Sequence, residues 1–451
     1  MTDLVRRVAA AAPADADDVD ANQTVSKVAR RLVPFLVACF FAAYLDRVNV
    51  GFAALSMNAD LGFSSEIFGF GAGIFFIGYS LFEAPSNFIL HRVGARRWIA
   101  RIMVSWGLVS ALMAFVWDSA SFLALRFLLG VAEAGFAPGA ILYLTYWIPL
   151  ERRARILGAF LLAVPLSSAV GAPLSSLALA AMDGVAGLKG WQWLFLLEAI
   201  PSMLLGIVAF FYLTDKPKDA DWLTPAERTW LQARLDGEQA ANNASHDEAF
   251  WRTLRHPRVL ALGVAYFGVV SSLYGVGFWL PQIVHGFGYG VIESGFVTAI
   301  PYVCAAIAMV VWSRHSDRKG ERFWHTALPA LAAAMGLAAS GYAGSPTTAM
   351  LSLSVAATGT LAAMPPFWTL PTAFLSGLGA AVGIALVNSI GNLAGFFGPY
   401  LVGWIKTGTG DFSSALTALA IGPILCAVIV LRLRGPSPAS LPSPRSPRTT
   451  A

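Results

Sequence analysis

The stretch YLDRVN, Tyr44 to Asn49, places two opposite charges inside an apolar run that extends from Pro34 to Met57. The run is long enough to cross a bilayer. A charge at that depth costs about 2.5–3.5 kcal/mol on insertion scales, so such residues usually face a bundle interior or a watery pathway. Neighbouring helical residues point about 100° apart, so Asp46 and Arg47 need separate partners. We interpret the pair as part of a substrate or proton pathway rather than a purely structural ion pair.

The composition indicates a membrane protein with many spans. Of the 451 residues, 57% are hydrophobic and only 13% are charged, whereas soluble domains carry about 25% charged residues. The three cysteines lie inside apolar runs, and neither they nor the six histidines show the spacing of a metal site or a disulfide framework. We therefore expect no metal, no cofactor and no nucleic-acid partner.

Apolar runs of about 18–25 residues predict an all-α membrane protein with twelve transmembrane helices in two pseudo-symmetric six-helix halves. The halves are expected at 31–214 and 258–434. Residues 1–30 and 435–451 are expected to be disordered cytoplasmic ends, and 215–257 a cytoplasmic linker with a short helix. Basic residues favour cytoplasmic termini, because the outer loops then contain only Lys189 and Lys406. The predicted spans are 34–57, 67–90, 98–117, 120–147, 155–181, 191–213, 258–284, 291–313, 324–343, 348–366, 371–402 and 413–432.

An internal repeat relates the two halves. The loops after spans two and eight carry matching residues 226 positions apart, and so do the prolines of spans five and eleven. Spans four and ten are predicted to be interrupted, by Pro138 and by Pro365-Pro366. Proline-interrupted spans at corresponding positions of two halves are typical of transporters. The matched pairs are Arg92 and Arg318, Gly94 and Gly320, Arg96 and Arg322, and Pro173 and Pro399.

These basic loops resemble the signature loop of the major facilitator superfamily, and Arg126–Gly130 resembles its fourth-helix motif. Further stretches resemble the anion:cation symporter family within it: Tyr44–Asn49, Gly73–Tyr79 with Pro85-Ser86-Asn87, Arg126–Gly139 and Gly190–Glu198. The resemblance covers about residues 30–432. It implies proton symport of an organic anion, with Arg47 as anion anchor and Asp46 and Glu133 as proton carriers.

The resemblance also implies a gate made by the two loop motifs. Its residues are Arg92, Gly94, Arg96, Asp317, Arg318, Gly320 and Arg322. One position departs from the family pattern, because His91 stands where the loop usually carries an acid. Asp317 keeps the acid in the second half.

The spacing within helix four supports the same roles. Arg126, Gly130 and Glu133 share one helix face, which should bring Glu133 to the depth of Asp46 and Arg47. Arginine binds both oxygens of a carboxylate and stays charged. A desolvated acid takes up a proton unless an arginine holds it ionised. We therefore expect the acid and the substrate carboxylate to compete for the arginine.

Neutral groups should complete the site. Tyr44 lies one turn from Arg47, and Asn388 and Asn392 share a face of helix eleven. We also place Tyr79, Arg126 and, with a weaker case, Tyr274 in the substrate site. Glu83 and Glu198 lie nearer span ends, beside prolines, and are interpreted as structural.

The predicted function is import of a small organic anion such as tartrate or a sugar acid by proton symport. The protein should work as a monomer in a bacterial inner membrane. An aromatic carboxylate is the alternative substrate. Anion exchange is disfavoured because Leu273 stands at the repeat position of Arg47. A membrane-embedded enzyme and a non-transporting sensor are the rivals from other classes, and the spans contain no nucleophile–base pair for the former.

Overall fold

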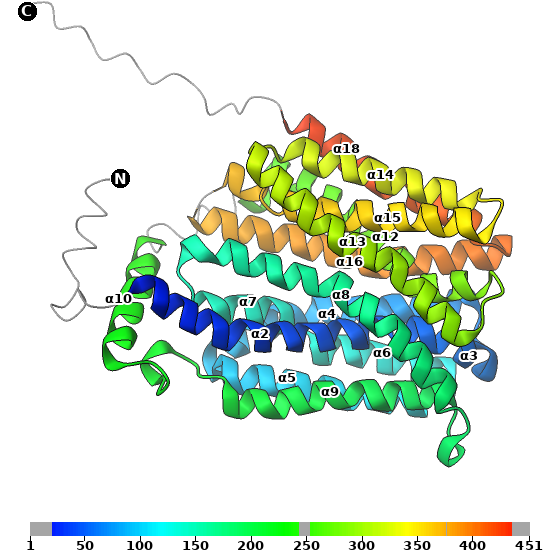
Figure 1. Cartoon of the computed structure of the whole chain (residues 1–451), viewed down its shortest axis with the longest axis horizontal. Coiled ribbons are helices and arrows are strands. Elements are labelled where there is room, and N and C mark those ends of the chain that lie inside the picture. The colour runs from blue at the N-terminus through cyan, green and yellow to red at the C-terminus, as the bar shows by residue number, and fades with distance from the viewer. Residues whose placement is uncertain (1–19, 243–252, 376, 435–451) are drawn as a thin grey trace, which may run out of the picture.

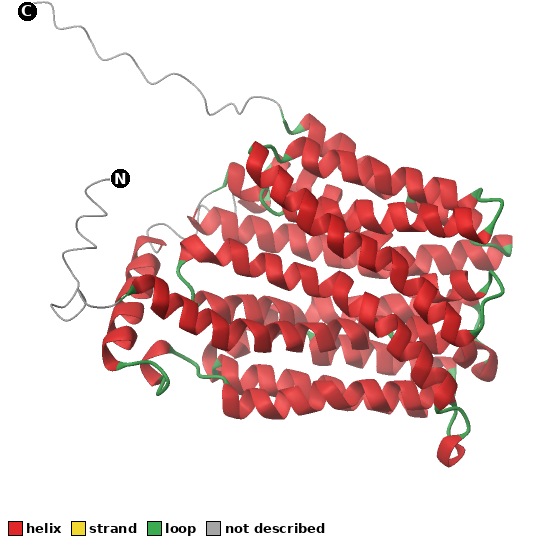
Figure 2. Ribbon diagram, viewed as in Figure 1, coloured by secondary structure: helices red, strands yellow, loops and turns green. Residues whose placement is uncertain are grey.

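The computed structural model describes residues 20–242, 253–375 and 377–434, and these parts contain helices and loops but no strand (Figure 2). The helices run along the long axis of the molecule in two groups (Figure 1). The first group comprises α2 (Ala21–Val48), α3 (Val50–Leu61), α4 (Ser65–Val93), α5 (Ala95–Leu112), α6 (Ser119–Glu133), α7 (Phe136–Thr145), α8 (Leu150–Ala181) and α9 (Gly190–Tyr212). The second comprises α12 (Pro257–His285), α13 (Val291–Lys319), α14 (Phe323–Gly341), α15 (Pro346–Phe367), α16 (Gly377–Thr409), α17 (Ser413–Leu419) and α18 (Ile421–Arg432).

The predicted architecture of two six-helix halves is confirmed. Eleven helices, or pairs of helices in line, within the described residues are long and apolar enough to cross a membrane. The predicted ninth span, α14, is not among them because it is rich in alanine and carries the polar Trp324, His325 and Thr326 in its first turn, which lowers its mean hydropathy. It packs against α15 and α18 within the same bundle, so it takes the ninth position.

Two spans break beside the charged residues. Span one divides at Asn49, between α2 and α3, so Arg47 lies in the last turn of α2. Span four divides at Ala134-Gly135, and Glu133 is the last residue of α6. The sequence predicts this break at Pro138. The break comes earlier because Pro138 lacks the N–H that would bond to the Ala134 carbonyl.

The other proline prediction also needs correction. Pro365 and Pro366 do not interrupt a span, since they lie in the last turn of α15. A short 3₁₀ turn, η5 (Pro371–Ala373), follows, and α16 begins at Gly377 rather than at residue 371. Proline cannot donate the next helical hydrogen bond, so the pair ends the helix and shifts the start of span eleven.

At one end of the bundle α2 begins and α18 ends; we call it the terminal end, and its opposite the distal end (Figure 1). The halves meet most closely towards the distal end. A Cβ on Gly69 of α4 would lie 2.6 Å from the Pro399 oxygen of α16, and one on Gly295 of α13 would lie 2.6 Å from the Ala172 oxygen of α8. Only glycine permits such contacts, so the seam between the halves is closed there.

The linker helix α10 (Pro225–Asn242) lies across the terminal end (Figure 1). A capping box begins this helix: Thr224 N–H donates to Glu227 at 2.8 Å, and Glu227 N–H donates to the Thr224 hydroxyl at 3.2 Å. Lys27 forms an ion pair of 2.9 Å with Glu227. Residues 21–30 were expected to be disordered, but they form the first turns of α2 because α10 packs beside them. Residues 1–19 and 435–451 lie outside the described residues.

Candidate functional site

Arg47 joins the two halves. Its Nη1 donates to the Tyr274 hydroxyl of α12 at 3.0 Å, and its Nη2 forms an ion pair with Glu133 of α6. Arg47 is only 9% exposed, and its Nε–H is buried without a hydrogen-bond partner. The guanidinium is therefore held from both halves, and its Nε is the nitrogen that has no partner.

Aromatic rings surround this guanidinium. Four ring centroids lie 5.2–5.7 Å from its central carbon, and they come from α2 and α4. At this distance a ring face attracts a cation, and the attraction grows when water is excluded. The rings belong to Tyr44, Phe75, Phe76 and Tyr79. Two of them, Tyr44 and Tyr79, were predicted as site residues, and Phe75 and Phe76 were missed because phenylalanines in a span read as ordinary core.

Glu133 lies beside Arg47, at the depth that the sequence predicted. It does so from the end of α6 and not from within a continuous helix four. It ends α6 and is 1% exposed, so its carboxylate is fixed against Arg47 rather than free on a continuous helix face. A buried ion pair needs both partners, because removal of one leaves an unpaired buried charge. Loss of Glu133 would therefore leave the Arg47 guanidinium as an unpaired buried charge.

Asp46 faces away from Arg47. It accepts hydrogen bonds from Trp106 Nε1 at 2.6 Å, Ser202 Oγ at 2.6 Å and Ser110 Oγ at 3.1 Å. These donors come from α5 and α9, inside the first half. Asp46 thus pairs with neutral donors and not with an arginine, because neighbouring residues of α2 point in different directions.

Arg126 also has partners other than those expected. It is fully buried, and it donates to the backbone oxygens of Gly71 at 3.1 Å and Ala72 at 3.2 Å. Gly130 makes this possible, because a Cβ there would lie 1.9 Å from the Phe75 oxygen and would push α6 away from α4. Arg126 thus fastens α6 to α4, and its role as substrate ligand stays a prediction.

Glu83 makes a second link between the halves. It accepts hydrogen bonds from Asn392 at 2.9 Å and Asn388 at 3.3 Å, both on α16. The shared face of the two asparagines was predicted, but their partner was not. The sequence analysis interprets Glu83 as structural. The pair of asparagines four residues apart on helix eleven is the signal that could have predicted this link to an acid of helix two.

The loop motifs form local structure at the terminal end. Gly94 has a φ of 97°, and the Arg96 N–H beside it donates to Asp215 at 2.9 Å. Asp215, which follows α9 and was missed by the sequence analysis, gives the first half the carboxylate that His91 does not supply.

In the second half, Arg322 pairs with Asp317 at 2.8 Å, and Gly320 has a φ of 63°. Arg92 lies over the ring of Phe88. Arg318 lies in the last turn of α13, where a cation interacts favourably with the helix dipole. The two loops are therefore similar in residues but use carboxylates from different places.

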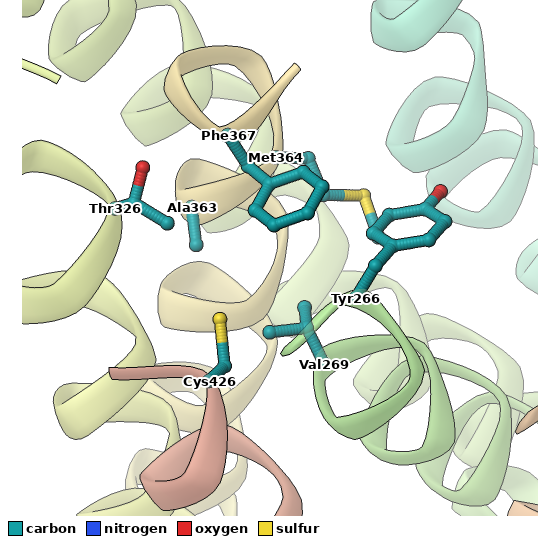
Figure 3. A pocket seen from close by; sticks show the side chains of 7 residues that line it. All are labelled: Tyr266, Val269, Thr326, Ala363, Met364, Phe367 and Cys426. Carbon is teal, nitrogen blue, oxygen red and sulfur yellow. The ribbon is translucent and has the colours of Figure 1, made fainter. Parts of the chain in front are cut away.

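A small space inside the second half is lined by apolar groups (Figure 3). Met364 and Phe367 face Tyr266 across it, and Cys426 lies below them in the view. It has no room for a water-sized guest, so we regard it as a packing gap. A larger hollow of about 690 Å³ opens at the terminal end, beside Arg96 and Asp215.

The profile described as Major Facilitator Superfamily matches residues 36–399. The chain belongs to this superfamily. A protein of Agrobacterium vitis, provisionally named a tartrate transporter, is 51% identical over 94% of each chain. A quinolone resistance transporter of Acinetobacter baumannii is 40% identical over 91% of this chain and 96% of its own. The solved inward-open conformation of the E. coli xylose transporter XylE aligns with a TM-score of 0.72 at 14% identity, over 92% and 98% of the chains.

This major facilitator protein is therefore a secondary transporter for a small molecule, with many membrane spans, and is not an enzyme. The likeness to XylE shows the fold alone. Within the described residues no three histidine, cysteine, aspartate or glutamate side chains gather as a metal site would require.

Proposed function

We propose that this protein imports a small organic anion, a hydroxycarboxylate such as tartrate or a sugar acid, by proton symport. One observation carries the proposal: Arg47 is held by Tyr274 from one half and Glu133 from the other, and its Nε–H has no partner. A guanidinium offers a carboxylate two parallel hydrogen bonds. An arginine at the seam of two halves can bind an anion from whichever side is open.

The ion pair supplies the coupling. While Glu133 is ionised it holds Arg47, and an incoming carboxylate meets a competing negative charge. A proton on Glu133 removes that charge and frees the Nη2 donor for the substrate. Anion and proton then occupy the site together, and both halves rearrange around a nearly neutral centre. The proton gradient is the only energy source, and no cofactor takes part.

Hydroxyl groups of the substrate fit the second link between the halves. Asn388 and Asn392 carry amide donors and acceptors, and Glu83 accepts hydrogen bonds. A hydroxycarboxylate can place its charge at Arg47 and its hydroxyls between these three residues. Recognition by polar groups from α4 and α16 would make binding sensitive to the distance between the halves.

The closed distal end gives the direction of access. With both chain ends in the cytoplasm, as the basic loops favour, the structure is closed towards the outside. An opening at the terminal end would then connect Arg47 with the cytoplasm, and that state would release an imported substrate. We place the protein in the bacterial inner membrane as a monomer.

An aromatic carboxylate is the second candidate, and the ring cluster favours it. Tyr44, Phe76 and Tyr79 lie around the cation that would bind the acid group. An aromatic substrate could stack on these rings. The hydroxycarboxylate is preferred because Glu83, Asn388 and Asn392 offer its hydroxyl groups polar partners that an aromatic ring would not use.

A thermal-shift panel on purified protein tests the proposal. Tartrate and sugar acids should raise the melting temperature with increasing concentration, since a ligand at about 100 times its Kd adds about 2.7 kcal/mol. Tartaric diamide has the same shape without the charges and should not act. Stabilisation by aromatic acids alone would favour the second candidate. Stabilisation by the diamide as much as by tartrate would contradict a carboxylate site.

A further inference from the structure

Two buried carboxyl groups lie inside the first half, away from the seam. Asp46 of α2 is 1% exposed and Glu198 of α9 is 6% exposed. Neither is in an ion pair in the described part of the chain, whereas Glu133 has Arg47. A buried charge without a partner is costly, so such a group is suited to take up and release a proton.

The surroundings of Asp46 are suited to proton transfer. Ser202 and Ser110 both hydrogen-bond its carboxylate. A hydroxyl can donate or accept, so each serine can turn when Asp46 gains or loses a proton. The charged group that acts on Asp46 from a neighbouring helix is Glu133. The site thus tolerates both protonation states of Asp46.

Glu198 has a similar neutral environment. Its Oε1 accepts a hydrogen bond of 2.6 Å from Ser175 of α8, and its Oε2 is buried without a partner. The amide nitrogen of Asn49 faces it from the break in span one, without reaching full hydrogen-bond geometry. The charged group that acts on Glu198 is Asp46. The unpaired Oε2 is the atom that a proton would occupy.

Glu198 and the Asp46 partner Ser202 lie on one face of α9, without a hydrogen bond between them. Ser202 lies one turn after Glu198, about 6 Å along the helix axis, on the same face. Because α9 begins at the distal end, Glu198 lies one turn closer to that end than Ser202 does. Glu198, Ser202 and Asp46 therefore form a row of polar side chains, which we call the file, that leads from the distal side to the middle of the first half.

The outer end of this file adjoins the seam. Ser175 bonds Glu198, and the next residue, Ser176, packs under Gly295 of α13, with its hydroxyl 3.4 Å from the Ile292 oxygen. This contact belongs to the closed distal seam. When α8 and α13 separate, water can reach the serine pair, and the closed contact shuts it out.

We propose that Glu198 is a proton-accepting residue that passes a proton from the distal side through Ser202 to Asp46. A water molecule between Glu198 and Ser202 takes the Glu198 proton and gives one of its own to the Ser202 oxygen, while Ser202 gives its hydrogen to Asp46, so no charge stays on the water or the serine. This inference rests on the proposed proton symport. It assigns Glu198 a role that the substrate site does not require.

Infrared spectroscopy without substrate tests the first step. Wild-type protein should show protonated-carboxyl absorption that disappears on alkaline titration, and Glu198→Gln should lack one component. After a pH jump, Ser202→Ala should slow the loss of the Asp46 component by at least about tenfold. Ser110→Ala removes an equivalent hydroxyl outside the file and should stay within about twofold. Identical wild-type and Glu198→Gln spectra, or equal rates in the two serine variants, would overturn the proposal.

Transport separates this inference from the proposed function. In proteoliposomes, Glu198→Gln should lower L-tartrate uptake driven by a pH gradient by at least about tenfold and leave counterflow within about twofold. Unchanged driven uptake in Glu198→Gln would overturn the relay and leave the substrate site intact. A wild-type protein that takes up no tartrate would contradict the proposed function, while the infrared comparison would still decide the relay. Melting temperatures of all variants show that they are folded.

Discussion

Arg47→Lys is expected to weaken binding of the best carboxylate by about ten- to a hundredfold while the protein stays folded. Lysine keeps the positive charge but loses the planar fork. A charge-assisted hydrogen bond contributes about 1.5–3 kcal/mol, and about 1.4 kcal/mol corresponds to tenfold in affinity. Lysine also cannot reach Tyr274 and Glu133 together with the geometry seen for Arg47. Calorimetric titration of purified protein measures the change.

Arg126→Lys provides the contrast. Arg126 is fully buried and bonds only backbone oxygens of α4. Its replacement should lower the melting temperature or the yield, and the ligand affinity of the folded fraction then decides whether Arg126 is also a substrate ligand. Near-wild-type affinity in well-folded Arg47→Lys would contradict the anchor role of Arg47.

Glu133→Gln is expected to abolish accumulation of substrate against its gradient but to preserve binding and counterflow. Glutamine resembles the protonated acid, so Arg47 is permanently free to bind the anion. The transporter without substrate can then no longer release a proton from residue 133 and re-form the ion pair with Arg47. Uptake into proteoliposomes with an imposed pH gradient measures the loss, which should be complete within error.

Glu293→Gln is the matched control. Glu293 is exposed in the first turn of α13, where it caps the helix through the Gly290 N–H. The same chemical change there should leave accumulation near the wild-type level. A Glu133→Gln protein that still concentrates substrate would move coupling to another acid, with Asp46 the next to test.

The predictable part of the site follows from the free energy needed to bury a charge in the membrane. A charge in a membrane span is expensive, so depth alone singled out Asp46, Arg47, Glu133 and Arg126. Helical spacing then predicted that Gly130 and Glu133 lie on the same face of helix four. It predicted likewise that the two asparagines of helix eleven share a face. The twelve-span fold followed from the lengths of apolar runs, which depend only on bilayer thickness.

The missing part depends on which side of a helix faces which neighbour. Spacing within one helix does not reveal that Asp46 faces Trp106 and that Arg47 faces Tyr274. The partners of Glu83 are more than 300 positions away, and the partner of the first gate loop, Asp215, lies in the segment after α9. The helix breaks at Asn49 and Gly135 were hidden for a similar reason, because tertiary packing fixes where an interrupted span bends.

Proton movement during substrate entry tests the central claim most directly. Wild-type protein is placed in proteoliposomes without a pH gradient, and the carboxylate that stabilises it best is added outside. Proton symport predicts immediate alkalinisation of the medium that rises with substrate uptake and disappears in Glu133→Gln. Entry of the carboxylate with no accompanying proton uptake would contradict the account.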